Sequence, residues 1–507
     1  MNPVFSPQAF VPEEVGCYLG DQPRASARIK TRPEDFIVEE LDTEGRQLTI
    51  GTASDLSEEE QFIVKGPFVA ATLVKRGYST YDAVKRICSQ MGIPKGDVTY
   101  GGLKDGAAIT AQLVVFKTTS QDVVERNCWP ENLSGPGPGC FLKNVTRASK
   151  LLRKGHLTGN RFTLRVLLPG MSAAEIDAYL QPLLAKLQQR GNLFPNFYNR
   201  QRLGRRQNLT KIGYTLMTEG PQAAIKLFLT ETSPNEHAGL TAVRQALLKD
   251  WQQAEKRSAD TGTPLWTQWP YFDGMRLTLE HPSNQRLKLA NEHDIVVATL
   301  GLQEGETFRQ VMADLHGVFS LWIGAWQSYW FNQALAMVLR GEITIPGNSI
   351  PLYTKDPATE DWYRRNGLAG AIVENVDPDV AELFLGARSV NVSTVVDGDR
   401  NGYGRNGRRH RRGMPERLPQ RHSTVPQGPP RSALISLRDL SYTIEDGCWN
   451  VSFLLQSGGY ATTFLDAMFD VEQDERVSDQ RSARLDPTKR NDGRRGQPWK
   501  HQNNTSA

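Results

Sequence analysis

The amino-acid sequence predicts a mixed α/β fold (α+β mixed) centred on a mixed β-sheet, and three observations support this class. Between residues 68 and 116 the patterns follow the order strand, helix, strand, loop and strand, which is typical of a helix packed on a sheet. Residues 211–255 carry apolar side chains at helical spacing. Residues 321–339 form the most apolar helical stretch of the chain. The 507 residues are enough for two or three domains with a sizeable core.

Composition and charge exclude several classes of protein. Hydrophobic residues make up 39% of the chain and aromatic residues 8%, so the chain is not disordered as a whole. The net charge of +4 is too small for a protein that simply coats nucleic acid, so any nucleic-acid site must come from local clustering of charge. The N-terminus lacks a signal-peptide pattern, and no apolar run reaches the roughly eighteen residues needed to cross a bilayer. We therefore expect a cytoplasmic protein with no membrane partner.

The cysteines and histidines give no pattern for a metal site. The five cysteines are scattered and odd in number, without the paired spacing of a zinc site or a disulfide framework, and the eight histidines are equally dispersed. No glycine-rich loop convincingly indicates a nucleotide cofactor. We therefore expect no metal, no cofactor and reduced cysteines.

The elements follow in chain order from an irregular lead-in over residues 1–28, which is rich in proline and glycine. Pro33 then interrupts the chain, and a strand begins at Phe36. After a buried strand comes a helix, because Ser79 or Thr80 can cap its start and apolar residues recur at helical spacing up to Gly92.

A glycine-bordered loop within residues 100–112 presents Lys104 and Asp105 between two strand-like segments. Its glycines lack a Cβ and let a bulky ligand approach the backbone closely. A carboxylate displayed on a loop that rigid strands hold is a common form of catalytic group. The same Lys-Asp-Gly sequence is also typical of an ordinary turn, so the pattern by itself leaves both interpretations open.

The chain after residue 150 contains segments of contrasting composition. Residues 159–165 alternate as in a half-buried strand. Residues 195–208 interleave aromatics, amides and arginines, which suits base stacking and phosphate binding but also an exposed loop. Residues 347–393 have short strand and turn signals. Residues 400–431 are arginine-rich and almost free of apolar residues; we expect a mobile basic loop that suits phosphate contact or, alternatively, a nuclear address. The tail over residues 471–507 is expected to be disordered.

Five of these blocks together resemble the signatures of the TruD family of tRNA pseudouridine synthases. The loop matches the family pattern Gly-x-Lys-Asp-x-x-Ala-x-Thr-x-Gln, although Gly106 and Ala107 stand where the family often has basic residues. Residues 30–40 resemble the pattern Lys-x-x-Pro-Glu-Asp-Phe-x-Val-x-Glu. The three further blocks follow in the family's order and contain Asn160 with Phe162, Gln201 with Arg202, and Tyr460.

The resemblance implies a split pseudouridine-synthase catalytic domain, with a mixed sheet, into which a TRUD-type α/β domain is inserted. The first catalytic part would cover residues 29–193. The inserted domain would cover residues 194–440, including the basic loop, and residues 441–470 would close the catalytic domain.

The resemblance also implies an activity, the isomerisation of uridine to pseudouridine in RNA, with uridine 13 of tRNA as the first substrate to propose. Asp105 would act as the catalytic nucleophile, or as the base at the ribose 2′ position, and Lys30 would keep it ionised. We expect the protein to bind RNA, namely tRNA, and to be a monomer. The implied pocket and RNA contacts are Phe36, Asn160, Phe162, Tyr460, Gln201 and Arg202. Without the resemblance, Lys30 fits a solvated lysine, and Phe36 and Phe162 fit core positions.

Two alternatives remain open. A non-catalytic RNA-binding protein of the same fold would keep the basic and aromatic segments but would not need Asp105. An RNA hydrolase or methyltransferase would need paired acid and base groups or a glycine-rich cofactor loop, and the sequence contains neither convincingly.

Overall fold

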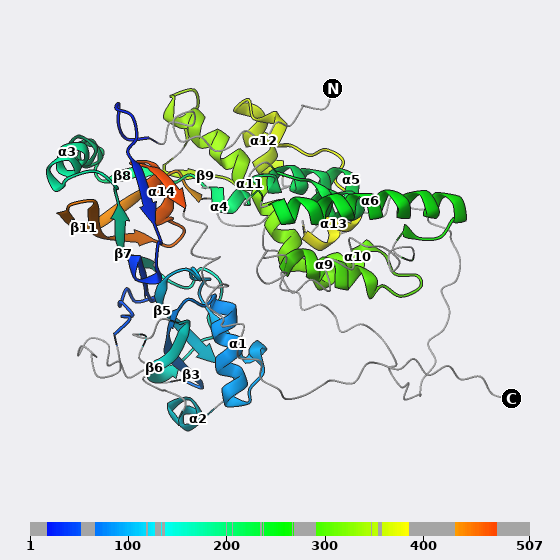
Figure 1. Ribbon diagram of the computed structural model, residues 1–507, viewed down its shortest axis with the longest axis horizontal. Helices are drawn as coiled ribbons and strands as arrows, with labels where there is room; N and C mark the ends of the chain where they lie inside the picture. The colour runs from blue at the N-terminus through cyan, green and yellow to red at the C-terminus, as the bar shows by residue number, and fades with distance from the viewer. Residues whose placement is uncertain are drawn as a thin grey trace.

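In the computed structural model, a large β-sheet with its covering helices lies beside a part built almost entirely of helices (Figure 1). The described residues are 18–51, 66–117, 120–126, 133, 137–198, 200–204, 206–233, 236, 238–265, 267, 290–345, 347–352, 357–384 and 431–473. Among them, no helix combines the length and the apolar character that crossing a membrane requires. Most of the lead-in, the basic loop up to residue 430 and the tail from residue 474 lie outside the described residues, so the expectations for them stay predictions.

Among the described residues, eleven strands form the main sheet, whose central order is β6-β3-β5-β2-β7-β12-β11-β8. Most neighbouring strands are antiparallel, whereas β2 with β5 and β1 with β13 are parallel, so the sheet is mixed, as the sequence predicts. The strands are β1 Ser26–Ile29, β2 Phe36–Leu41, β3 Phe68–Arg76, β4 Val98–Tyr100, β5 Ile109–Phe116, β6 Gly139–Ala148, β7 Gly159–Leu167, β8 Leu193–Pro195, β11 Leu434–Glu445, β12 Cys448–Gln456 and β13 Asp470–Gln473.

The strand patterns follow from which face of the sheet is covered. Along β7 the side chains of Phe162, Leu164 and Val166 are buried, which confirms the predicted half-buried strand. By contrast, β3 is buried at every interior position, including the polar Thr72 and Lys75. The strands β11 and β12 form a hairpin closed at Gly447, whose φ of +70° suits a tight turn. The closing catalytic segment was predicted to begin at residue 441, but the strand β11 starts at Leu434. The sheet therefore includes residues on both sides of that predicted boundary.

In the part of the chain that the structure describes, the helices beside the sheet are α1 Thr80–Met91, α2 Gln121–Arg126, α3 Ala173–Gln189 and α14 Ala461–Asp466. The ends of α1 are as predicted, because the Ser79 side chain accepts a hydrogen bond from the Asp82 backbone N–H and Gly92 adopts a left-handed conformation. One face of α1 buries Ala83, Val84 and Ile87 against the sheet. This packing fixes the end of the sheet that presents the loop after β4.

The helical part lies between β8 and β11 in the sequence. Its helices are α4 Arg200–Leu203, α5 Leu209–Thr230, α6 Ala238–Thr261, α9 Ala290–Leu300, α10 Phe308–Asp314, α11 His316–Leu339, α12 Pro357–Arg365 and α13 Pro378–Phe384. The pattern over residues 211–255 corresponds to two helices, α5 and α6, and α5 itself is kinked at Gly220 before Pro221. The apolar helix α11 buries Trp322 and Trp326 at the centre of this part, as expected of a core helix.

Residues 347–393 require a correction. Their short strand and turn signals correspond to α12 and α13 over most of residues 357–384, and the strand β9 there covers only Ser349–Ile350, which pairs with β10 (Arg431–Ser432). Pro357 and Pro378, which resemble turn residues in the sequence, are the first residues of the two helices. A proline is tolerated there because the first N–H of a helix has no partner within the helix.

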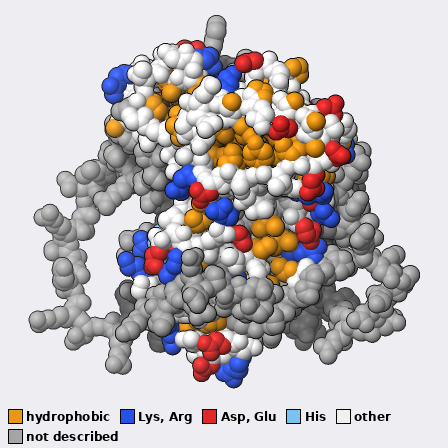
Figure 2. All heavy atoms as spheres, turned by 90° about the vertical axis from the view of Figure 1, so that its left-hand side faces the viewer, with side chains coloured by type: hydrophobic (Ala, Val, Ile, Leu, Met, Phe, Trp, Pro, Cys, Tyr) orange, Lys and Arg blue, Asp and Glu red, His pale blue; other side chains and the backbone are white. Residues whose placement is uncertain are grey.

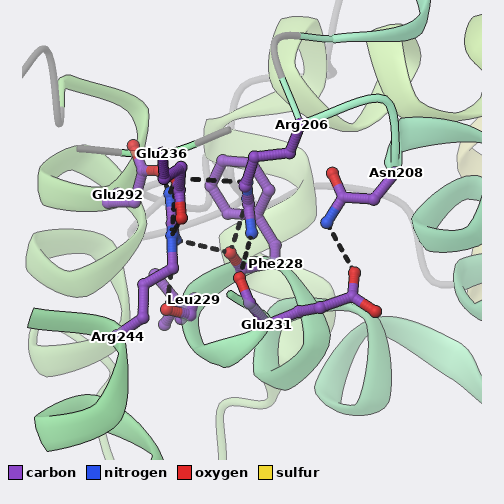
Figure 3. Close-up of polar contacts among 8 residues, drawn as sticks. All are labelled: Arg206, Asn208, Phe228, Leu229, Glu231, Glu236, Arg244 and Glu292. Carbon is purple, nitrogen blue, oxygen red and sulfur yellow. Dashed lines mark hydrogen bonds and ion pairs between the residues drawn. The ribbon is translucent and has the colours of Figure 1, made fainter. Parts of the chain in front are cut away.

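A buried ion-pair network closes the C-terminal end of α5 (Figure 3). The Arg206 and Arg244 guanidinium groups both donate to the Phe228 carbonyl oxygen, at 2.8 and 3.0 Å. Arg244 also pairs with the Glu236 and Glu292 carboxylates, at 2.9 and 2.8 Å. Burial, then the charge of Arg244, lowers the Arg206 pKa to about 10. The two arginines thus satisfy carbonyl groups that the helix leaves without partners.

The two parts meet where α4, α11 and α14 come together beside the sheet (Figure 1). The Asn332 side chain of α11 bonds both the N–H and the carbonyl of Tyr198, each at 2.8 Å. From α14, the Thr463 hydroxyl donates to the Phe197 carbonyl at 3.0 Å. The segment after β8 is therefore held by both parts.

Figure 2 shows the face that turns away from the helical part. Hydrophobic side chains gather in a band on it, and basic and acidic side chains are mixed around that band. On this face the charges do not separate into one large basic patch, in keeping with the small net charge.

Candidate active site

The loop between β4 and β5 is fixed from three sides. The Thr80 hydroxyl of α1 accepts a hydrogen bond from the Lys104 N–H at 2.9 Å and donates to the Gln112 side chain at 2.8 Å. Gln112 in turn donates to the Gly102 carbonyl at 3.1 Å. A Cβ on Gly101 would lie 2.8 Å from the His156 carbonyl oxygen, so this close approach requires glycine. The loop is thus a rigid support for the residue at its centre, Asp105.

Two lysines hold Asp105. The Lys30 ammonium forms an ion pair with one carboxylate oxygen, and the Ala107 N–H donates to the other at 2.9 Å. The buried Lys75 ammonium of β3 donates to the Asp105 backbone carbonyl at 2.7 Å. Lys30 itself has a φ of +57°, an uncommon conformation for a residue other than glycine.

These contacts decide the charge of Asp105. Burial opposes ionisation, but the Lys30 ammonium, the Ala107 N–H and the Lys75 charge outweigh it, so the pKa of Asp105 lies below its ordinary value. The carboxylate is therefore ionised at neutral pH, and its side chain keeps 25% of its surface exposed. Burial lowers the pKa of Lys75 to about 8. The site thus presents a charged carboxylate that a ligand can reach.

Beside Asp105, a buried chain of polar groups leads from β2 to β7. The Lys104 ammonium lies 2.7 Å from a carboxylate oxygen of Glu40, and both side chains are buried. It also donates to Asn160 Oδ1 at 2.7 Å. This bond fixes the orientation of the Asn160 amide. Within the described part of the chain, its Nδ2 has no acceptor, so two N–H donors remain for a ligand.

The predicted pocket aromatics Phe36 and Phe162 lie together at the same site. The Lys30 ammonium is 4.2 Å from the centre of the Phe36 ring, and Phe36 meets Phe162 edge to face at 6.1 Å. Phe162 stacks on Phe453 of β12. Only 3% of Phe36 and 7% of Phe162 is exposed, so the rings also belong to the core of the sheet.

The other predicted residues form a second group at the junction of the two parts. Tyr460 lies 6.2 Å from the Tyr198 ring and 5.2 Å from the Arg431 guanidinium. Arg202 of α4 also lies beside Tyr198, with its guanidinium carbon 5.8 Å from the centre of the ring. Gln201 is also in α4, but its side chain lies outside the described residues. No ring–ring contact in the described part joins Tyr460 to Phe36 or Phe162.

Sequence reasoning did not select Glu40, Lys75 and Arg431. Lys75 stands in the apolar run of β3, and a lysine inside a fully buried strand is a usable signal because such a charge needs a partner. Glu40 ends the block that begins at Lys30. Arg431 had no comparable signal, because it stands at the edge of a long arginine-rich segment.

No group of three or more histidine, cysteine, aspartate or glutamate side chains gathers at a possible metal site among the residues that the structure describes.

Comparisons of the sequence with known proteins point to one family. The family model described as "tRNA pseudouridine synthase D (TruD)" matches residues 14–262. A relative in Methanocaldococcus jannaschii, "Probable tRNA pseudouridine synthase D 1", is 34% identical over 36% of this chain and 43% of its own. "tRNA pseudouridine synthase D" of Geobacter sulfurreducens is 30% identical over 44% and 48%, and that of Anaeromyxobacter dehalogenans is 29% identical over 51% and 69%. The matched part thus spans less than half the length of the first two relatives.

A solved structure shares the fold. The crystal structure of the putative tRNA pseudouridine synthase D (TruD) from Methanosarcina mazei superposes with a TM-score of 0.52 at 16% identity, covering 91% of this chain and 99% of the other. This likeness confirms the mixed α/β fold class.

Proposed function

We propose, from the match of residues 14–262 to the TruD family, that this chain is a tRNA pseudouridine synthase, which isomerises uridine to pseudouridine in RNA. One observation carries the proposal: Asp105 is an ionised, partly exposed carboxylate on a rigid loop, paired with Lys30. Both residues belong to blocks that resemble the family's signatures. We propose the cytoplasm as the place of action, because tRNA is the proposed substrate.

The reaction rearranges one nucleotide. The bond between N1 of uracil and C1′ of ribose breaks, a bond between C5 and C1′ forms, one proton leaves C5 and one joins N1. Because atoms and electrons balance within the nucleotide, the isomerisation needs no oxidant and no energy source. We propose Asp105 as the group that starts it, either as nucleophile at C1′ or at C6 of uracil, or as base at the ribose 2′ position.

The other residues of the site would bind a uridine that has been taken out of the base stack. Removing the base from the stack costs a few kcal/mol. Asn160 would donate its free N–H groups to an oxygen of the nucleotide, since Lys104 occupies its carbonyl oxygen. Phe36 and Phe162 would offer the extracted base an apolar edge in place of its lost neighbours. Lys30 would hold Asp105 in its charged form and in position.

We propose tRNA as the substrate class because the curated relatives are named for it, with uridine 13 as the position to test first. Site-mapped pseudouridine is measured in tRNA from cells that lack the protein, complemented with wild type or with Asp105→Asn. Wild type should restore the modification at position 13, and Asp105→Asn should not, although it still binds tRNA. If both variants restore it, Asp105 is not the reacting group; if neither does, the substrate or the reaction class is wrong.

A non-catalytic RNA-binding protein of the same fold is the second candidate. It is favoured by the arginines and aromatic rings at the junction of the two parts, which need no reacting group. Unchanged cellular function of Asp105→Asn, together with intact tRNA binding, would support this candidate over the first.

A further inference from the structure

A group of basic side chains at the junction of the two parts lacks acidic partners. Arg202 of α4 and Arg431 of β10 both lie against the ring of Tyr198, with guanidinium carbons 5.8 and 4.0 Å from its centre. Among the described residues, neither arginine forms an ion pair with a carboxylate. Two like charges that share one ring repel each other, so an anion from outside the chain would stabilise the arrangement.

All three nitrogens of Arg431 already donate hydrogen bonds to the protein. It donates to the Asn196 backbone and side-chain oxygens and, at 2.8 Å, to the Gly458 carbonyl. Burial, which is the largest influence, and the charge of Arg202 lower its pKa. Its contribution is therefore a fixed positive charge behind the site.

Arg202 is the opposite case. Its Nε donates to the Ser328 hydroxyl of α11 at 3.2 Å, which orients the side chain. Its two terminal nitrogens have no acceptor in the described part of the chain, and the side chain is only half-buried. A guanidinium held by its Nε with both terminal nitrogens open is suited to two parallel hydrogen bonds to a phosphate.

A third cation, Lys154, comes from the sheet side. It stands in a turn that packs on the catalytic loop, because the Gly155 N–H donates to the Gly101 carbonyl at 2.7 Å and the Leu152 N–H donates to Thr99 at 3.2 Å. The Lys154 ammonium has no hydrogen bond or ion pair with any described residue. Its pKa is lowered first by burial and then by the charge of Arg202.

We propose that Lys154 and Arg202 together bind one backbone phosphate of the RNA strand beside the reacting uridine, with Arg431 as the positive charge behind them. The two ligands come from the sheet side and from the helical part, so one phosphate would bridge the parts next to the catalytic loop. The proposal rests on the proposed function, because it takes RNA as the ligand.

The salt dependence of RNA binding tests it. Affinity for an unmodified tRNA transcript is measured against salt concentration for wild type, Lys154→Gln, Arg202→Gln and the double variant. Each neutralised phosphate contributes about 0.7–0.9 to the slope of log K against log salt. The slope of each single variant should be smaller than that of wild type by about this amount. The slope of the double variant should be no smaller than that of either single variant, because both substitutions remove the same contact.

Three further variants serve as controls. Lys186→Gln removes a cation of α3 that is paired with Asp21, away from the junction, and should keep the wild-type slope. Arg202→Lys keeps the charge and should keep most of the slope while losing affinity, because lysine lacks the two-pronged geometry. Lys154→Gln carries the test if Arg202→Gln proves unstable, since Lys154 has no partner among the described residues.

Chemical change of the RNA locates the contact. In a short RNA that contains the target uridine, neutral methylphosphonate groups replace single phosphates in turn. One position should weaken binding by wild type but leave binding by Lys154→Gln unchanged.

Unchanged slopes in both single variants would overturn the proposal. A double variant whose slope falls by twice the amount seen in a single variant would show that Lys154 and Arg202 bind two separate phosphates, and would overturn the shared site. The same assays separate this proposal from the proposed function. A wild type that makes pseudouridine while its slope is insensitive to Lys154 and Arg202 overturns the phosphate site alone. A wild type that binds RNA with the expected slopes but makes no pseudouridine overturns only the reaction, and absence of RNA binding overturns both.

Discussion

Replacing Lys104 by methionine tests the buried polar chain beside Asp105. Lys104 and Glu40 have side-chain exposures of 6% and 0%, so solvent does not screen their pairing. Lys104→Met leaves the Glu40 carboxylate buried without its counter-charge. Removal of one partner from a buried ion pair typically costs about 3–5 kcal/mol, and we expect a loss of unfolding free energy of this size.

The loss should depend on pH with a definite sign. Burial raises the pKa of Glu40 above its ordinary value of 4.5 even with Lys104 present, and removal of Lys104 raises it further. Folded Lys104→Met therefore takes up a proton as the pH falls through this raised pKa, whereas the unfolded chain does so only near 4.5. The variant's defect should be full at pH 8 and should shrink as the pH approaches 5.

Urea unfolding at pH 8 and pH 5 measures both effects, and the double variant Lys104→Met with Glu40→Gln is the matched control. The neutral amide removes the unpaired charge and should recover most of the loss at pH 8. A defect that is equal at the two pH values, together with no recovery by Glu40→Gln, would refute the reasoning. In that case the loss would come from the packing of the lysine stem rather than from the charge.

Three more variants test other parts of the structure. Lys30→Met removes the main cation at Asp105, so the pKa of the carboxylate rises, and as the pH is lowered the single-turnover rate should begin to fall at a higher pH than in wild type. Lys30→Arg should keep the wild-type pH profile, and coincident profiles of Lys30→Met and wild type would contradict this role. Arg244→Met breaks the network of Figure 3 and should cost about 3–5 kcal/mol in urea unfolding, against at most about 1 kcal/mol for the exposed Arg340→Met, and equal losses would count against a buried network. Gly213→Ala places a Cβ 2.2 Å from the Trp322 carbonyl oxygen where α5 crosses α11, and should cost about 1–3 kcal/mol, whereas Gly96→Ala, whose Cβ meets no atom within 4 Å, should be nearly neutral by the same measurement.

Local signals predicted those parts of the fold that depend on neighbouring residues. The helix from Thr80 to Met91 has the expected cap at Ser79 and the expected end at Gly92, because both depend on residues within one turn. The strand through Phe162 and the core helix through Trp326 were equally readable from their periodicity or apolar content. Residues 357–384 were misread because a proline looks the same in a turn and at the first position of a helix.

The candidate site divides in the same way. The sequence by itself determined that Asp105 stands on a glycine-bordered loop between strands and, through the resemblance, that Lys30 would lie near it, since motifs preserve residue types and spacing. Only the tertiary structure decided that the buried Lys75 supports the loop, that Lys104 joins Glu40 to Asn160, and that Tyr460 meets Arg431 instead of the phenylalanines. These contacts join strands, loops and helices that are far apart in the chain. Their formation depends on sheet order and domain packing, which no local pattern of residues encodes.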